Sequence, residues 1–237
     1  MRTAMIVEAR RRLGEFAHPA KAAGQRAYFK NCGGDTFLGV TAAGVRRVAR
    51  EFRDLPLADI AVLMHSAVHE ERSLAHAILR LRCEKAEPRE QAELFRFYMR
   101  HRSAIHDWDG VDDSAPYIAG RYLLARSKTV LYRMIRARSL WDRRIALVAT
   151  WWFIRNGNVR DTLALCALVL HDPEDLIHKA AGWMLREVGK RDGRALAGFL
   201  DEHARAMPRT MLRYAIERFP EPERQRYLRA RNRQAHL

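Results

Sequence analysis

Three aspartates lie within five positions of the segment WDGVDDSAPY at residues 108–117, in a chain whose formal net charge is +15. A carboxylate held among cations stays ionised, which suits an ion pair, a general base or the stabilisation of a developing positive charge. On a helix, Trp108 and Asp112 stand four residues apart and share a face. Asp112 is therefore the candidate for chemistry, with a structural partner of an arginine as the alternative. We interpret Asp109 and Asp113 as solvated residues or as acidic residues favoured at a helix amino terminus.

The elements that carry this segment are predicted to be helices. Apolar residues recur at three- and four-residue steps in AELFRFYMRHRSAI and RRIALVATWWFIR, whereas alternating runs are scarce. Pro56, Pro88, Pro173 and Pro208 stand where one helical pattern gives way to the next, so we expect helices to start there. Pro116 is tolerated only in a first helical turn or at a kink. The chain is predicted to be all-α.

A period of 34 to 36 residues runs through most of the chain. Segments aligned at five positions, here called the repeat stripe, are separated by steps of 36, 36, 35 and 34; the stripe comprises Arg72, Trp108, Arg144, Lys179 and Arg213. Two helices per period are typical of HEAT or TPR hairpins, which stack because one hairpin cannot bury its apolar face alone. We expect a curved α-solenoid of HEAT-like repeats with a concave basic groove, a single domain over residues 1–237, and a cap before the first repeat.

Equivalent repeat positions lie on one surface of a solenoid, so the repeat stripe is expected to be exposed and mostly cationic. Lys179, Trp183 and Arg186 follow one helical face, which places an aromatic residue in a basic surface. We expect Trp108 and Trp183 in the exposed groove. Core positions are expected for the tryptophans that sit among apolar neighbours, namely Trp141, Trp151 and Trp152.

Composition favours a polyanionic partner. Lys and Arg number 43 against 28 Asp and Glu, and nucleic acid leads the candidates, with ordinary solubility in an Arg-rich proteome as the alternative. Cys32, Cys83 and Cys166 are widely spaced, and the ten histidines show no ligand spacing, so neither a disulfide framework nor a metal site or cofactor is predicted. No run approaches the ~20 apolar residues of a membrane span. We expect a soluble cytoplasmic monomer without an obligate protein partner.

With these motifs, the chain resembles the AlkD family of HEAT-like-repeat DNA glycosylases, from AYFKN to LRYAIERF. The most specific parts are WDGVD, WDRRIAL and HKAAGWMLRE, in the family's order and spacing. AYFKN supplies Tyr28, which matches a tyrosine near the lesion, and FLGVTAAGVRR supplies Arg47 at a basic helix start that meets the DNA backbone. Asp107, where an aromatic residue is common, and the additional cation Arg143 depart from the pattern and put the accepted lesion in question.

The resemblance implies a monofunctional DNA glycosylase of base excision repair, acting on duplex DNA that contains an alkylated purine. It would hydrolyse the N-glycosidic bond of cationic N3- or N7-alkylated purines without deep base flipping. Asp112 would stabilise the developing oxocarbenium ion and orient water, and Trp108 and Trp183 would cradle the lesion nucleotide. The phosphates would be held by Arg144 and Arg186, in a track extended by Arg72, Lys179 and Arg213.

Two other functions fit the same sequence. In a catalytically silent nucleic-acid-binding solenoid, Asp112 would only order neighbouring arginines. In a protein-binding HEAT scaffold, the basic stripe would be unexplained. The sequence also leaves open whether the lesion is a small methyl adduct or a bulky natural-product adduct, and whether N3 or N7 is preferred.

Overall fold

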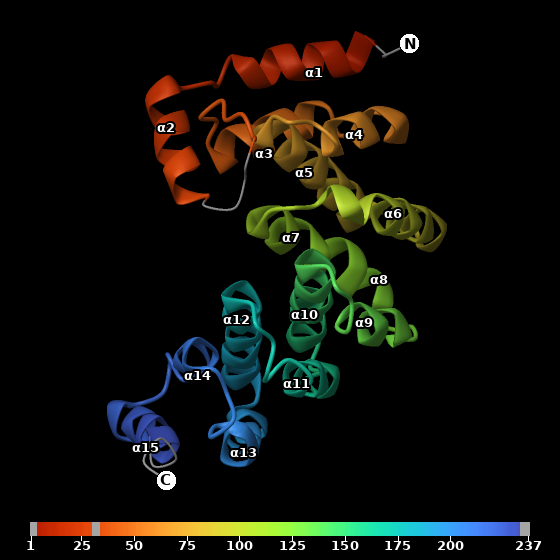
Figure 1. Ribbon diagram of the computed structural model, residues 1–237. Helices are drawn as coiled ribbons and strands as arrows, with labels where there is room; N and C mark the ends of the chain where they lie inside the picture. The colour runs from red at the N-terminus through yellow and green to blue at the C-terminus, as the bar shows by residue number, and fades with distance from the viewer. Residues whose placement is uncertain (1–3, 30–33, 233–237) are drawn as a thin grey trace. The chain divides into compact units, whose positions relative to one another are not determined.

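The computed structural model describes residues 4–29 and 34–232. The chain divides into two compact units, Met1–Tyr122 and Leu123–Leu237, and Figure 1 labels the helices of both. Each unit is described below by itself. The expectation of a single domain over residues 1–237 stays a prediction.

The described residues form helices and contain no β-strand. The first unit contains α1 Ala4–Gly14, α2 Pro19–Tyr28, α3 Ala42–Glu51, α4 Leu57–Met64, α5 His69–Lys85, α6 Pro88–His101, the 3-10 turn η1 Arg102–Ala104, α7 Trp108–Ala115 and the π-helical turn η2 Pro116–Gly120. The short helix α8, Arg121–Leu123, spans the boundary. The second unit contains α9 Thr129–Met134, α10 Leu140–Arg155, α11 Arg160–Ala167, α12 Asp175–Arg191, α13 Gly193–His203, α14 Arg209–Ala215 and α15 Glu221–Asn232.

Helix contacts within each unit follow the pattern of stacked hairpins. Helix α5 contacts its chain neighbours α4 and α6 and also the helices two places away, α3 and α7. Helix α12 contacts α11 and α13, and likewise α10 and α14. The positions of the repeat stripe fall on α5 and α7 in the first unit and on α10, α12 and α14 in the second. The predicted all-α fold of helical repeats is confirmed, while its curvature and concave basic groove stay predictions.

The prolines mark helix starts as predicted. Pro56 and Pro208 are the residues that cap α4 and α14, and Pro88 is the first residue of α6. Pro173 lies two residues before α12. Pro116 takes the kink alternative, because it directly follows α7 and opens a π-helical turn, where a proline's missing N–H is tolerated.

The connection at residues 34–40 is held against α5 and forms one side of the site described below. The buried carboxylate of Glu70 accepts hydrogen bonds from the backbone N–H groups of residues 38–40, at 2.8 to 3.2 Å. Gly39 has a φ of 81°, and a Cβ there would lie 2.1 Å from the carbonyl oxygen of His18. Glycine is required at this position because both the backbone conformation and the close approach exclude a side chain.

The interiors of the units are apolar and contain thiols that are not reactive. Cys83 and Cys166 are free and buried, and burial raises the pKa of the Cys83 thiol to about 12. Cys32 lies outside the described residues. Among the described helices, none combines the length and the apolar character needed to cross a membrane.

Candidate functional site

Helix α7 carries the acidic segment, and it begins at Trp108 because Asp107 caps it. The Asp107 carboxylate accepts a hydrogen bond from the backbone N–H of Gly110 at 2.9 Å. Asp112 lies one turn after Trp108 on the same helical face, and both residues are partly exposed. The predicted pairing of Trp108 with Asp112 is thus present on one short, capped helix.

Trp108 and Asp112 line an open cleft of about 360 Å³ within the first unit. The other walls come from the end of α2, from α3 with the residue range before it, and from one face of α5. The remaining lining residues are Gln25, Phe29, Val40, Ala42, Val45, Arg46, His69, Glu70, Ser73, His76, Asp109, Gly110 and Asp113. Asp112 therefore borders accessible space and is not part of the apolar core.

Arg72 is buried, so its expected place on an exposed stripe was wrong, and its role in DNA binding stays a prediction. Its residue exposure is 1%, and its guanidinium lies between two buried carboxylates. Nη2 donates to Asp35 Oδ2 at 2.5 Å and to Asp107 Oδ2 at 3.0 Å, and Nη1 donates to the Ser66 carbonyl at 2.9 Å. The arginine joins the 34–40 connection, α5 and the start of α7.

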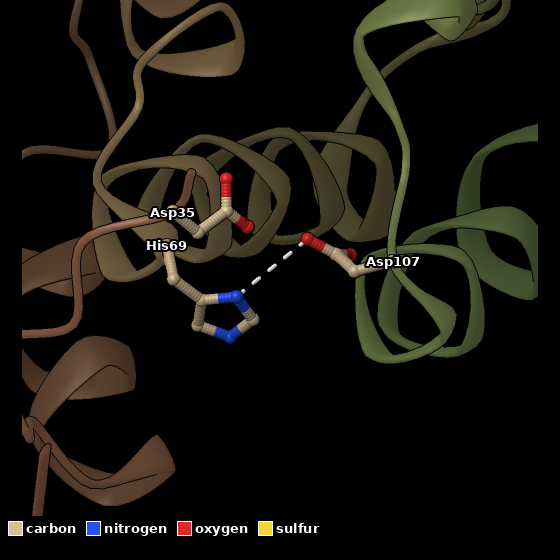
Figure 2. Close-up of side chains that lie close together, drawn as sticks. All are labelled: Asp35, His69 and Asp107. Atoms are coloured by element: carbon tan, nitrogen blue, oxygen red, sulfur yellow. Dashed lines mark ion pairs between the residues drawn. The ribbon is translucent and has the colours of Figure 1, made fainter. Parts of the chain in front are cut away.

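His69 continues this buried network toward the cleft. Figure 2 shows the His69 ring beside Asp35 and facing Asp107, with Nδ1 3.6 Å from Asp107 Oδ2. On the other side of the ring, Nε2 lies 3.0 Å from Asp109 Oδ2. Burial alone would lower the pKa of His69, but the hydrogen bond to Asp109 raises it above the ordinary value. Asp35, His69 and Asp107 have the donor types of a metal site, yet their carboxylates are engaged with the Arg72 guanidinium.

The two other aspartates of the segment have defined partners. Asp109 lies in the first turn of α7, which was one of the two expected alternatives. It is not solvated, because its side chain is bound to His69 and burial raises its pKa. Asp113 is 42% exposed and forms an ion pair of 2.8 Å with Arg80, whose guanidinium also stacks over the Tyr117 ring. The three aspartates of one helix thus have three different environments.

Aromatic rings from α2 lie beside Trp108. The Phe29 ring is stacked on Trp108, with centroids 5.3 Å apart and an interplanar angle of 16°. Tyr28 meets Trp108 edge-on at 5.7 Å and is 68% exposed. The structure therefore brings the predicted Tyr28 next to Trp108. Arg47, predicted to meet the DNA backbone, is exposed on α3, with its Nε 3.7 Å from Glu51.

The cationic residues predicted in the second unit differ in how far their side chains are exposed. Arg144 is 5% exposed and donates from Nη1 to the Leu176 carbonyl at 2.7 Å, so its predicted place on an exposed stripe was wrong. Arg213 is exposed. Lys179 is partly exposed and pairs with Asp175 at 2.8 Å. The prediction that the repeat stripe is exposed is therefore wrong for two of its arginines, Arg72 and Arg144, which are both buried.

Trp183 and Arg186 share α12 with Lys179, as predicted, and both are partly exposed. Arg186 forms an ion pair with Glu217, so a phosphate would have to compete with that carboxylate. The tryptophans expected in the core are only half-buried, namely Trp141, Trp151 and Trp152. The expectation of core positions is not met, because none of the three is fully buried, and the Arg155 guanidinium lies over Trp151.

Charge is unevenly divided between the units. Residues 1–122 contain 20 Lys and Arg against 16 Asp and Glu, whereas residues 123–237 contain 23 against 12. The basic excess that favours a polyanion is therefore mainly a property of the second unit, while the acidic segment belongs to the first.

The sequence did not predict three residues that support the cleft: Asp107, which caps α7, and His69 and His76 on α5, which line the cleft. Asp107 departs from the family's motif, and an aspartate directly before the first residue of a helix is itself a capping signal. His69 and His76 stand seven residues apart, which places them on one face of α5. This spacing could have indicated a shared face for the two histidines, but it does not show that Asp109 and the cleft lie next to that face.

Comparison with known proteins bears on this arrangement. A family model described as DNA alkylation repair enzyme matches residues 9–219. The fold is similar to a solved structure described as a predicted DNA alkylation repair enzyme from Enterococcus faecalis, with a TM-score of 0.68 and 19% sequence identity, covering 86% of this chain and 97% of that one. No curated protein matches the chain. The family match spans both units, including the capped helix with Trp108 and Asp112, and the chain belongs to the DNA alkylation repair enzyme family.

Proposed function

We propose that the protein is a monofunctional DNA glycosylase that releases cationic N3- or N7-alkylated purines from duplex DNA. The observation that carries this proposal is the position of Asp112 and Trp108, one turn apart on a capped helix at the edge of an open cleft. Membership of the DNA alkylation repair enzyme family supports alkylated DNA as the class of substrate. The carboxylate and the indole supply the two groups that hydrolysis of a cationic nucleotide needs.

The chemistry requires little from the protein besides charge stabilisation. An alkylated purine is already cationic, so the bond between C1′ and the purine nitrogen breaks with its electron pair moving to the ring, and the base leaves neutral. Asp112 stabilises the positive charge that develops on the sugar and orients a water molecule. The water oxygen then bonds to C1′, its proton is lost to the carboxylate or to solvent, and an abasic site remains.

Aromatic and cationic residues would hold the lesion strand. Trp108 contacts the sugar and the cationic base, an interaction worth about 0.5–2 kcal/mol when partly desolvated. Trp183 is proposed as a second aromatic contact and Tyr28 as a neighbour of the lesion. Lys179, Arg186 and Arg213 would bind phosphates without reading sequence, together with Arg47 of the first unit. Capture of the lesion at the surface also permits bulky adducts as substrates.

Product analysis tests the proposal. Duplex DNA carrying N7-methylguanine or N3-methyladenine is incubated with the wild-type protein, and free bases are separated by chromatography. The expected product is the intact methylated base together with an abasic site. Repair by removal of the methyl group would yield the unmodified base in DNA, and a silent nucleic-acid-binding protein would bind the duplex without either product. Either result would overturn the proposed activity.

A further inference from the structure

The cleft has an interior that the proposed hydrolysis does not use. Its floor is one face of α5, formed by His69, Ser73 and His76, and its sides are α3 and α7. Its volume of about 360 Å³ lies within the range of about 300–1,000 Å³ that is usual for small-molecule sites. Apolar side chains of Val40 and Val45 line one side. The space therefore suits a small molecule with one apolar face.

Several buried polar atoms of this cleft have no hydrogen-bond partner among the residues that the structure describes. Both ring nitrogens of His76 belong to this group, and the residue is only 2% exposed. The Oε1 atom of Gln25 is also buried and unpartnered, although its Nε2 donates to the Val40 carbonyl at 3.1 Å. Leaving such an atom unsatisfied is unfavourable, because it has lost its hydrogen bonds to water. Their placement around one cleft indicates a polar ligand.

The protonation state of His76 restricts what that ligand can be. Burial lowers the pKa of the ring to about 4, so at neutral pH it is uncharged. A neutral imidazole donates one hydrogen bond and accepts another, while Gln25 Oε1 only accepts. The complement of these atoms is a molecule with hydrogen-bond donors and an acceptor on one edge. At the end of the cleft the stacked rings of Phe29 and Trp108 add a surface for a flat ring.

We propose that this cleft binds the free purine base after its release from DNA. A purine is flat, carries hydrogen-bond donors and acceptors along its edges, and becomes uncharged when the glycosidic bond breaks. Asp112 borders the same cleft, so a base released there reaches the floor without crossing bulk solvent. The inference rests on the proposed function for the identity of the ligand, and it adds a product site that would slow turnover when free base accumulates.

Titration of the full-length protein with free 3-methyladenine, followed by calorimetry, tests the product site without DNA. Saturable binding at one site is expected. Ala42→Phe would fill the cleft from the exposed start of α3, and His76→Phe would remove both ring nitrogens. Each variant should weaken binding at least tenfold. Ala43→Phe is the matched control, because Ala43 is exposed and does not line the cleft, and it should bind as wild type does.

The outcomes separate this inference from the proposed activity. Absence of saturable binding, or equal binding by wild type and Ala42→Phe, would overturn the product site even if alkylated DNA is processed. Binding that only the cleft variants lose supports the site. If 3-methyladenine binds but no base is ever released from alkylated DNA, the glycosylase assignment fails while the purine-binding cleft stands. Circular dichroism of each variant establishes that a loss of binding is not a loss of fold.

Discussion

Replacing Arg72 by leucine should lower the free energy of unfolding by about 3–5 kcal/mol. The guanidinium is surrounded by Asp35 and Asp107, whose side chains are only 7% and 6% exposed, and by the Ser66 carbonyl. Without the guanidinium, two buried carboxylates lie close together and keep only the imidazoles of His69 and His106 as partners of opposite charge. The loss is a large part of the ~5–15 kcal/mol by which typical domains are stable.

Urea unfolding followed by circular dichroism measures this effect. Arg47→Leu is the matched control, because its side chain is 61% exposed, and it should change stability by no more than about 0.5 kcal/mol. A triple variant that adds Asp35→Asn and Asp107→Asn to Arg72→Leu removes the stranded charges and keeps a side chain that can cap α7. It should be more stable than Arg72→Leu alone. An Arg72→Leu protein as stable as wild type, or a triple variant no better than the single one, would refute the buried network.

Four further predictions concern the first unit's site and the helices of the second unit. Burial lowers the pKa of His76 from 6.5 to about 4 in the folded state, so the unfolded state binds more protons between these two pH values. The free energy of unfolding should therefore fall by roughly 3 kcal/mol as the pH drops through this window. Denaturation at several pH values should show a smaller fall for His76→Phe. Gly110→Ala should destabilise the protein by roughly 1–3 kcal/mol, since the added methyl would lie 2.3 Å from the capping carboxylate. Gly198→Ala on α13, with open space around it, should instead stabilise by about 0.5–1 kcal/mol in the same melts. Arg213→Ala should reduce the salt slope of duplex binding by about 0.9, whereas Arg194→Ala on α13, a helix without a repeat-stripe residue, should leave it unchanged. Equal slopes for both variants would remove Arg213 from the DNA contact.

The helical repeat was predictable because it depends on spacing within the chain. The apolar periodicity and the prolines at 56, 88, 173 and 208 act locally, and the helices begin beside them. The 34–36 residue period places the residues of the repeat stripe on alternate helices, as found. Trp108 and Asp112 could be paired for the same reason, since a four-residue step decides which face of a helix they share.

The burial of individual charges was not predictable from the period. Arg72 and Arg213 hold equivalent repeat positions, yet one is buried and the other exposed. The difference comes from Asp35, a residue 37 positions away from Arg72 in the connection before α3. Such a partner lies outside any repeat. The cleft was also missed, because its walls come from four helices and depend on how α2 and α3 pack beside α5 and α7.

Single-turnover base release tests the central claim most directly. Excess protein is mixed with duplex DNA containing one N3-methyladenine, and the rate of free base release is compared for wild type, Asp112→Asn and Asp113→Asn. Asp113 is the neighbouring carboxylate, partly exposed and paired with Arg80. We expect Asp112→Asn to release base at least a hundredfold more slowly and Asp113→Asn to remain near the wild-type rate. Equal release by wild type and Asp112→Asn, or no release by wild type, would contradict the role assigned to this carboxylate.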